Sequence, residues 1–269
     1  MPTFISMNRK DRCGHRRRLL RSKSSEAAKK TAVAAFWLLV WESAARLTAN
    51  TIILVGPFDA FTRLYELALT ANFWLSIQHS LLRVLLGFAS SLIIGVVLAI
   101  LCSANKVINA LLMPLINVIK SIPVVSFALL AMMWLSPARL SAFVAFITVL
   151  PIIFYNTYKG IENTDLNLLQ MAGVFRVGLF KKIRYIYIPS VAPFVISAAE
   201  SGLGFAWKSA IAAEVISMGA RNTIGGSMHM ARTFLLTADL FAWTIAIVAL
   251  SFLMERAFFL LFGRIKKWQ

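Results

Sequence analysis

Charged residues are scarce in this chain, which has 269 positions but only 11 Asp and Glu and 28 Lys and Arg. They make up 14% of the sequence, whereas soluble domains usually contain about 25%. A soluble protein of this length would therefore lack the charged side chains that cover a water-exposed surface. Because 59% of the residues are hydrophobic and the mean hydropathy is +0.75, the sequence predicts an integral membrane protein and nearly excludes a soluble enzyme.

Two further absences exclude particular chemistries. The chain has only two cysteines, Cys13 and Cys102, so neither a disulfide framework nor a metal site is expected. Glycine never directly precedes lysine, so the phosphate-binding sequence G-x-x-x-x-G-K-[ST] is missing. We therefore expect the chain to be no ATPase and to bind no cofactor itself. Any ATP–Mg that drives it belongs on a partner chain.

Long apolar runs predict about six transmembrane helices, since a span needs about 20 residues. Backbone groups in lipid must hydrogen-bond within their own segment, which makes these runs helices, and the alternation typical of a membrane barrel is missing. The expected fold class is therefore all-α integral membrane. We expect the spans at Thr31–Leu47, Leu81–Leu101, Ile108–Leu135, Leu140–Tyr158, Pro189–Met218 and Leu235–Phe262.

Residues 1–30 form a basic segment with ten Lys or Arg, which we expect to be a poorly ordered cytosolic tail ahead of a transmembrane domain over residues 31–269. Such a tail suits anionic lipid headgroups, and its lack of interleaved aromatic residues argues against nucleic-acid binding. A cleavable signal peptide is the alternative. Because Glu42 and Arg46 interrupt the next apolar stretch and are spaced to pair on one helix face, we favour an uncleaved first helix.

The distribution of Lys and Arg predicts that both termini are cytosolic, because basic residues concentrate in the connections after the second, fourth and sixth helices. The connection from Lys159 to Ile188 is too long for a turn. Its apolar residues recur at three- and four-residue spacings, which predicts short amphipathic helices broken near Gly173 and Gly178. A helix lying flat on the membrane surface is the alternative interpretation.

Two apolar runs contain candidates for a gate or a solute path. In the third run Pro123 follows Ser121 and is expected to bend the helix, as a gate or as a simple kink. The fifth run holds Glu200, Lys208 and Glu214, and each charge at a membrane centre costs about 2.5–3.5 kcal/mol. These charges either pair internally to hold helices together or line a polar path. The sequence leaves both interpretations open.

The rest of the fifth run favours close helix packing, because Gly202 and Gly204 lie beside other small residues. Trp207, next to Lys208, is also a candidate path residue. Glu200 and Glu214 are fourteen residues apart, which returns them to nearly the same helix face. Intramembrane carboxylates also suit an ion-gradient-driven secondary transporter. We found no inverted repeat with paired broken helices to support that alternative.

The segment Gln170–Pro189, QMAGVFRVGLFKKIRYIYIP, resembles the cytoplasmic EAA loop of binding-protein-dependent ABC importer permeases. That family has Glu-Ala-Ala, three residues, a Gly, and a hydrophobic-x-Pro ending thirteen residues later. Gln170 to Ala172 take the place of the triplet, and Pro189 ends the pattern at the same spacing. There are two departures, because Gln170 replaces the acidic residue and Arg176 stands at the glycine position.

Three more segments resemble the nitrate, sulfonate and taurine branch of this family: HSLLRVLLGF, KSIPVVSFALLAMMWL and GFAWKSAIAAEVIS. So do Gly225–Gly226, Asp239 and Trp268, and the resemblance covers about Thr31 to Trp268. It implies a permease subunit of the cell membrane that works as a homodimer or with a second permease. An extracytoplasmic binding protein would deliver a small anion, a sulfonate or a vitamin-related heterocycle. A separate ABC ATPase would be docked by the loop residues Gln170, Met171, Ala172, Gly173, Arg176, Lys181, Lys182, Arg184 and Pro189.

Overall fold

The computed structural model describes the chain except for residues 1–28, 30, 49, 218–221 and 263–269, and it describes side chains as far as residue 260. No strand occurs among the described residues, which are helices joined by turns and short loops, so the predicted all-α class is confirmed. The predicted basic tail lies outside the described residues apart from residue 29. By its contacts the chain divides into two compact units, residues 1–62 and 63–269. The expected single transmembrane domain over residues 31–269 stays a prediction.

The first unit contains a helix over residues 31–48 and the beginning of α2 (Pro57–Ala68). As the spacing predicted, Arg46 Nε donates a hydrogen bond of 2.7 Å to Glu42 Oε1 on the helix surface. The indole Nε1 of Trp41 donates to the carbonyl of Val55 at 2.9 Å, so the chain folds back along the helix after it ends. Helix α2 was not expected, although its proline start and the Asp59 in its first turn both favour a helix N-terminus.

Four described helices are long and apolar enough to cross a membrane, and a bent helix pair adds a fifth span if the pair is counted as one. A membrane protein built of helices is thereby confirmed, whereas six spans, with residues 31–48 as the first, stay a prediction. The four are α3 (Ala71–Ala104), α6 (Pro137–Glu162), the continuous helix that ends in α9 (Ile188–Ile216), and α11 (Thr237–Phe262); the bent pair is α4 (Lys106–Ser121) with α5 (Val124–Ala131).

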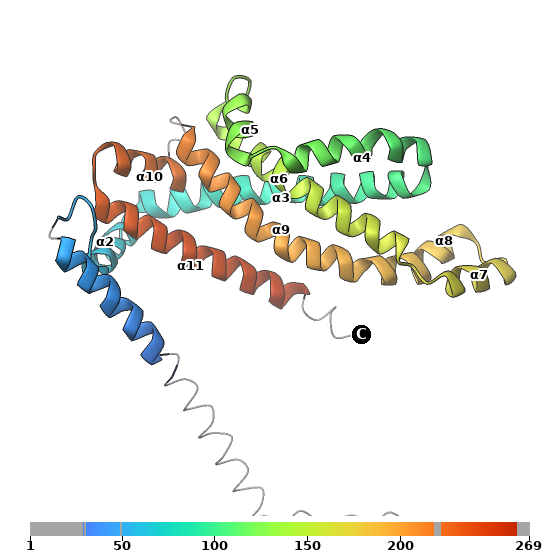
Figure 1. The fold of residues 1–269 in the computed structure, drawn as a ribbon, viewed down its shortest axis with the longest axis horizontal. Helices are drawn as coiled ribbons and strands as arrows, with labels where there is room; N and C mark the ends of the chain where they lie inside the picture. Colours follow the sequence, from blue (N-terminus) through green and yellow to red (C-terminus); the bar gives the residue numbers. More distant parts are fainter. Residues whose placement is uncertain (1–28, 30, 49, 218–221, 263–269) are drawn as a thin grey trace, which may run out of the picture. The chain divides into compact units, whose positions relative to one another are not determined.

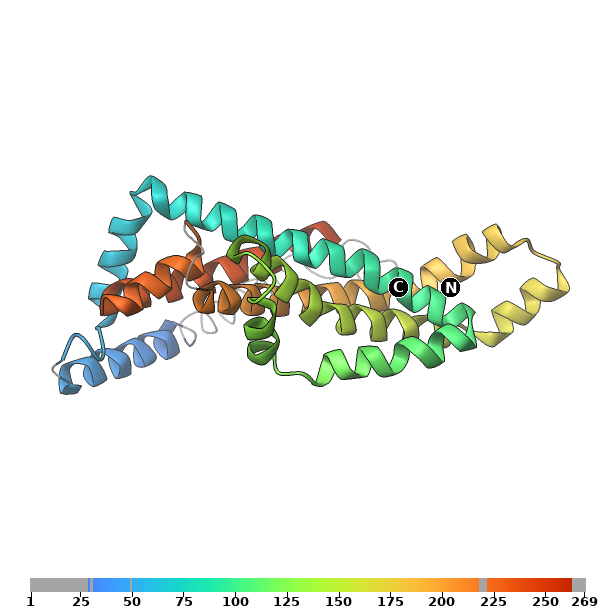
Figure 2. The ribbon, with the colours of Figure 1, turned by 90° about the horizontal axis from the view of Figure 1, so that it is seen from above.

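The centre of the second unit is formed by α3, α6 and α9, which run side by side (Figures 1 and 2). Gly202 on α9 is buried, and a Cβ atom there would lie 2.9 Å from Val149 Cγ1 on α6. The close packing predicted for this run is therefore present. Trp207 is only 1% exposed, and its Nε1 donates to the Ile247 carbonyl of α11 at 3.2 Å.

The prediction of one kinked helix over Ile108–Leu135 is wrong, because α4 and α5 are separate helices bent by 100° relative to each other. Ile122 adopts the extended backbone (φ −76°, ψ 129°) that a residue before proline prefers. Pro123 in turn cannot donate a backbone hydrogen bond, so the two residues together end α4. Pro114 and Pro151, by contrast, lie inside α4 and α6 and end neither helix.

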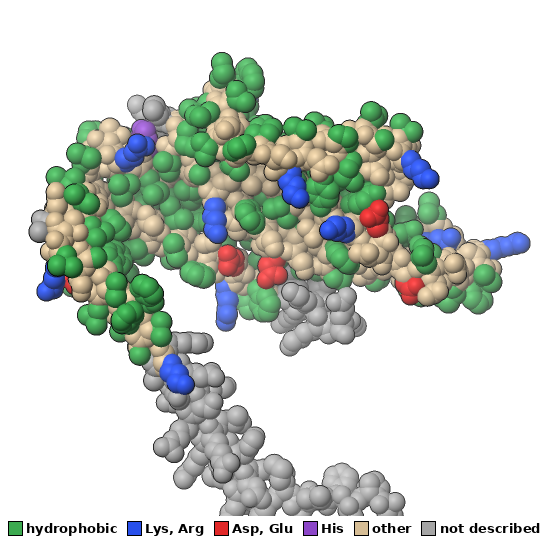
Figure 3. Space-filling view, viewed as in Figure 1, with side chains coloured by type: hydrophobic (Ala, Val, Ile, Leu, Met, Phe, Trp, Pro, Cys, Tyr) green, Lys and Arg blue, Asp and Glu red, His purple; other side chains and the backbone are tan. Residues whose placement is uncertain are grey.

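Short elements occupy the two ends of the second unit. At one end lie α7 (Leu166–Val174), α8 (Leu179–Lys182) and a π-helical turn (Ile183–Tyr187), and α10 (Ile224–Thr233) lies at the other (Figures 1 and 2). The predicted short helices are thus present, although Gly173 lies inside α7 and the break follows it. Hydrophobic side chains spread over the visible face, and basic side chains stand out at the α7–α8 end (Figure 3).

Candidate functional site

The helix α7 carries the triplet of the loop pattern. It is capped by Asp165, whose carboxylate accepts a hydrogen bond of 2.8 Å from the backbone N–H of Asn167. Ala172 is 2% exposed and packs inward, whereas Met171 is 51% exposed. No described residue lies within 4 Å of a Cβ atom placed on Gly173. The helix therefore packs through Ala172 and presents an open surface beside it.

Arg176 has a backbone conformation that explains the glycine of the family pattern. Its φ is +49°, in the left-handed region that favours glycine. The N–H of Val177 bonds to the Ala172 carbonyl at 2.9 Å, and the N–H of Arg176 bonds to the Gly173 carbonyl at 3.0 Å. These two bonds form the Schellman turn that ends many helices. The turn is thus kept although arginine replaces glycine.

The outward surface of the loop combines apolar and basic side chains. Apolar side chains that are 73–81% exposed come from both helices and the turn between them, and they are Val174, Phe175, Leu179 and Phe180. Arg176, Lys181 and Arg184 are exposed beside them, and Lys182 is half-buried. The predicted basic residues therefore surround an apolar patch, which is typical of a surface that binds another protein or a membrane. From the sequence, only the triplet, the basic residues, Gly173 and Pro189 were expected to dock the ATPase. Phe175, which the structure shows to be exposed, was missed.

Pro189 ends the loop pattern at the start of α9. Proline lacks an N–H, but the helix continues through it because the N–H of Ile188 bonds five residues back to the carbonyl of Ile183. This π-type bond joins the loop to α9 without a gap. The α8 end is therefore continuous with the long helix that carries Glu200, Lys208 and Glu214.

Glu214 lies in a buried cluster that ties three helices together. Its Oε2 accepts hydrogen bonds from Ser80 Oγ on α3 at 2.7 Å and from the backbone N–H of Gly225 on α10 at 3.2 Å. Its Oε1 lies 3.7 Å from Arg83 Nη1. The hydroxyl of Ser80 also accepts from the N–H of Ile224 at 3.0 Å. The N-terminus of α10 thus meets a carboxylate, which its helix dipole favours.

Lys208 and Glu200 lie on the exposed side of the same helix. With Ser201 and Phe205, Lys208 belongs to an exposed row at helical spacing along α9. Lys208 forms no ion pair with a carboxylate in the described part of the chain. Glu200 and Glu214 therefore differ in environment although their spacing places them on similar faces, because Glu214 is buried against Ser80 of α3 and Gly225 of α10 whereas Glu200 is exposed.

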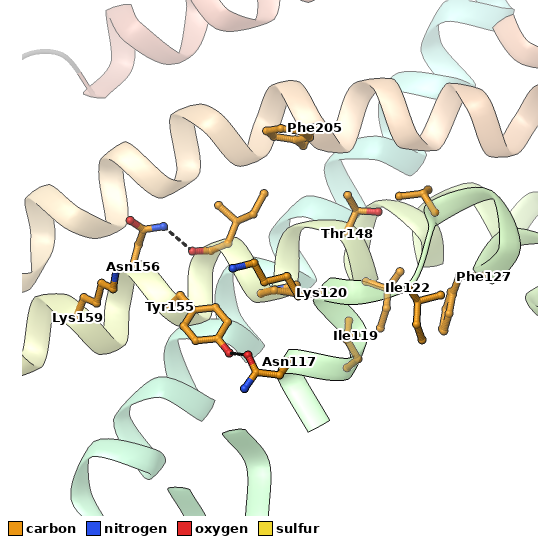
Figure 4. A pocket seen from close by; sticks show the side chains of 14 residues that line it. Asn117, Ile119, Lys120, Ile122, Phe127, Thr148, Tyr155, Asn156, Lys159 and Phe205 are labelled. Carbon is orange, nitrogen blue, oxygen red and sulfur yellow. Dashed lines mark hydrogen bonds between the residues drawn. The ribbon is translucent and has the colours of Figure 1, made fainter. Parts of the chain in front are cut away.

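A cavity of about 630 Å³ lies between α4, α5, α6 and α9 (Figure 4). Among the described residues, two lysines line it and no Asp or Glu does. Lys120 Nζ lies 5.2 Å from the centre of the Tyr155 ring, and Tyr155 Oη donates to Asn117 Oδ1 at 2.5 Å. Sequence reasoning missed this cavity because its walls come from separate helices. The polar lining consists of Asn117, Lys120, Thr148, Tyr155, Asn156 and Lys159.

The predicted gate residues lie beside this cavity. Ser121 and Pro123 are exposed, and the residue between them, Ile122, lines the cavity. Ser121 Oγ donates to the carbonyl of Asn117 at 2.8 Å, within α4. Trp207, the remaining candidate, lies in the helical core and does not line the cavity.

Comparisons with known proteins show the family of this chain. The sequence profile of the family described as "Binding-protein-dependent transport system inner membrane component" matches residues 91–267. The bicarbonate transport system permease protein of Synechococcus elongatus is 30% identical over 198 residues, which cover 68% of this chain and 69% of that protein. The putative aliphatic sulfonates transport permease protein of Bacillus subtilis is 25% identical over 238 residues, which cover 86% and 84%.

Two solved structures share the fold. The crystal structure of an amino acid ABC transporter with histidines aligns at a TM-score of 0.62 and 18% identity, over 77% of this chain and 98% of that one. A bacterial alginate ABC transporter aligns at the same TM-score and 13% identity, over 93% and 98%. The chain therefore belongs to the binding-protein-dependent transport system inner membrane component family, and it is a membrane permease subunit of an ABC transporter and not an enzyme.

Proposed function

We propose that this chain is the membrane-spanning subunit of an ATP-driven importer and that its α7–α8 loop docks on a separate ATPase. The observation that supports this docking is the exposed apolar patch of Val174, Phe175, Leu179 and Phe180, which basic side chains surround. An apolar patch rimmed by charges suits a groove on a partner protein. ATP–Mg is then held by the partner, and ATP-driven closure reaches the membrane through the continuous helix from Leu179 to Ile216.

The same proposal includes the other partners. An extracytoplasmic solute-binding protein delivers the solute, and a second permease, either another copy of this chain or a different one, completes the path. The exposed row on α9 and the cavity beside it support this arrangement, because one chain alone leaves both open on one side. Both termini lie in the cytosol, in line with the basic connections at the α7–α8 end.

The solute is a small anion or a sulfonate. Relatives that support this class include permeases named for bicarbonate, aliphatic sulfonates and nitrate. A vitamin-related heterocycle is the alternative. The binding protein carries much of the selectivity in such systems, so ligand identification on the cognate binding protein decides between the two.

A substitution of Gly173 tests the docking. Gly173 is exposed, and a Cβ atom there meets nothing within 4 Å, so Gly173→Glu leaves the chain itself undisturbed. We expect this variant to insert into the membrane at the normal level but to lose copurification with the ATPase. Gly173→Ala is the matched control and keeps the complex. Ala172 is a poorer test because it is buried, and bulk there disturbs α7 itself. A Gly173→Glu complex that stays intact and imports normally would contradict the docking role.

A further inference from the structure

We propose that the cavity between α4, α5, α6 and α9 is a binding site for a small anion, in which Lys120 and Lys159 hold the negative group (Figure 4). The proposal rests on the proposed function, because it treats the cavity as part of the solute path. It deepens that function by naming the residues and the charge of the ligand.

The charge balance of the cavity carries the argument. Two ammonium groups line it, no carboxylate does, and neither lysine forms an ion pair within the described part of the chain. The remaining walls are largely apolar, with Ile147, Ile152 and Phe205 among them. Both lysines are exposed, so two like charges face one open cavity whose described lining holds no opposite charge. An anion supplies that counter-charge.

The lysine at the α4 wall is held in place without being neutralised. Its Nζ lies over the Tyr155 ring, and Tyr155 is fixed by its hydrogen bond to Asn117. A cation–π contact orients an ammonium but leaves its charge available to a ligand. Lys120 is therefore positioned before any ligand arrives, which lowers the entropic cost of binding.

A third donor, Asn156, lines the same cavity. In Figure 4 the amines of Lys120 and Lys159 are turned toward the part of the cavity where Asn156 lies. One N–H of the Asn156 amide donates to the Ile152 carbonyl at 2.8 Å, which leaves its second N–H for a ligand oxygen. Two ammonium groups and an amide suit the oxygens of nitrate, bicarbonate or a sulfonate, and they repel a cationic heterocycle.

The size of the cavity agrees with this class. Its volume of about 630 Å³ lies within the usual range of small-molecule sites, about 300–1,000 Å³. A sulfonate therefore fits with its organic part against Phe205 and its head between the lysines. A smaller inorganic anion fits together with water.

A single-cysteine experiment measures the charge of the cavity directly. Asn156→Cys is introduced into the full transporter complex after Cys13→Ser and Cys102→Ala. Its labelling rate is compared for two methanethiosulfonates of similar size, the anionic sulfonatoethyl reagent and the cationic trimethylammonioethyl reagent. Accessibility and thiolate fraction affect both reagents equally, so the ratio of the two rates reports the local potential. The anionic reagent also carries the sulfonate group of the proposed ligand class.

We expect the anionic reagent to react faster. Lys120→Gln together with Lys159→Gln should lower the ratio of the anionic to the cationic labelling rate by about tenfold. Each lysine attracts the anionic reagent and repels the cationic one, so its loss changes both rates and the two changes add in the ratio. Each single variant should lower it by less. Arg139→Gln is the matched control, because it removes a cation from α6 outside the cavity and should leave the ratio unchanged.

An unchanged ratio in the double variant would overturn the anion site, and so would a cavity that neither reagent enters. Copurification with the ATPase and ATP hydrolysis are measured on the same variants. A complex that stays assembled and hydrolyses ATP, yet shows no effect of the lysines on labelling, rejects the anion site alone. An unaltered chain that fails to bind the ATPase rejects the proposed function instead.

Discussion

The hydroxyl of Ser80 donates to the carboxylate of Glu214 at 2.7 Å, although the two residues are 134 positions apart. This bond joins α3 to α9 at the end of the bundle where α10 also begins. Glu214 Oε1 and Arg83 Nη1 are buried atoms without a hydrogen-bond partner in the part of the chain that the structure describes, and they lie 3.7 Å apart. Each of these two groups therefore depends on the opposite charge of the other.

A double-mutant cycle tests this dependence. Arg83→Ala leaves the fully buried Glu214 carboxylate without its counter-charge, which costs about 3–5 kcal/mol in soluble proteins, whereas Glu214→Ala leaves a partly exposed Arg83 and should cost less. We expect each single variant to lower the membrane level and the melting temperature in detergent. The double variant should lose less stability than the two single variants lose together, because it removes both charges and leaves neither without its partner. A Glu214→Ala protein that melts like the unaltered chain would exclude a structural role for the pair.

The Ser80 hydroxyl offers a milder version of the same test. Ser80→Ala leaves the Ile224 N–H without its partner and removes one of the two hydrogen bonds to Glu214, at a cost of about 1–3 kcal/mol. Thermal unfolding in detergent measures the loss. Ser201→Ala is the matched control, because the hydroxyl of Ser201 is exposed and bonds only within its own helix. If Ser80→Ala and Ser201→Ala lower the melting temperature equally, the hydrogen bonds of the buried cluster add no stability beyond that of an exposed serine.

Arg176→Gly is expected to stabilise the protein. The positive φ of Arg176 strains any residue with a Cβ atom, and glycine relieves this strain by about 1 kcal/mol. The melting temperature in detergent should therefore rise. Arg176→Ala removes the charge but keeps the backbone strain, so its melting temperature should not rise in the same way. If alanine stabilises as much as glycine, the cause is the charge and not the backbone.

The sequence predicts the parts of this fold that depend on neighbouring residues. Apolar length alone locates the cores of α3, α6, α9 and α11, and a four-residue spacing predicts the pair of Glu42 and Arg46. The family spacing even marks the position of Arg176, where the backbone turns into the left-handed region. Each of these features is decided within a few turns of one helix.

The missed features depend on contacts between distant segments or on short polar helices. Hydropathy does not detect α10, which is short and contains Gly, Ser and His. Lys208 is the nearest cation to Glu214 in the sequence, yet the fold brings Arg83 to it from α3. Lys120 and Lys159 lie 39 positions apart and share a cavity only because α4 and α6 lie together. A single sequence contains no record of such pairings.

The proposed topology predicts labelling from opposite sides. In a background without Cys13 and Cys102, Asn167→Cys on α7 should react only from the cytosol, because positive charge gathers in that loop. Thr70→Cys, just before α3, should react only from outside. Both residues are exposed, so accessibility does not limit either reaction. Ser25→Cys, outside the described residues, should behave like Asn167→Cys. Labelling of Asn167→Cys in intact cells by an impermeant reagent would reject this orientation.

Lys208→Met is expected to reduce uptake while leaving the protein at a near-normal level in the membrane. Lys208 is exposed and forms no ion pair within the described part of the chain, so its removal leaves no described carboxylate alone. It lies one turn beyond Phe205, which lines the cavity. Its ammonium therefore adds positive potential beside the anion site, and its loss should shift preference against anionic solutes.

The competing account makes Lys208 the structural partner of a glutamate. It predicts that Lys208→Met is lost from the membrane and that a second change, Glu200→Gln or Glu214→Gln, restores it. Glu214 already has Ser80, Gly225 and Arg83 around its carboxylate, which leaves little reason for such a rescue. Protein level and uptake by reconstituted vesicles are measured together, since only their combination separates the accounts. A normal protein level with weakened anion uptake would place Lys208 on the solute path. Loss of the protein from the membrane that a Glu→Gln change restores would make Lys208 the structural partner of that glutamate.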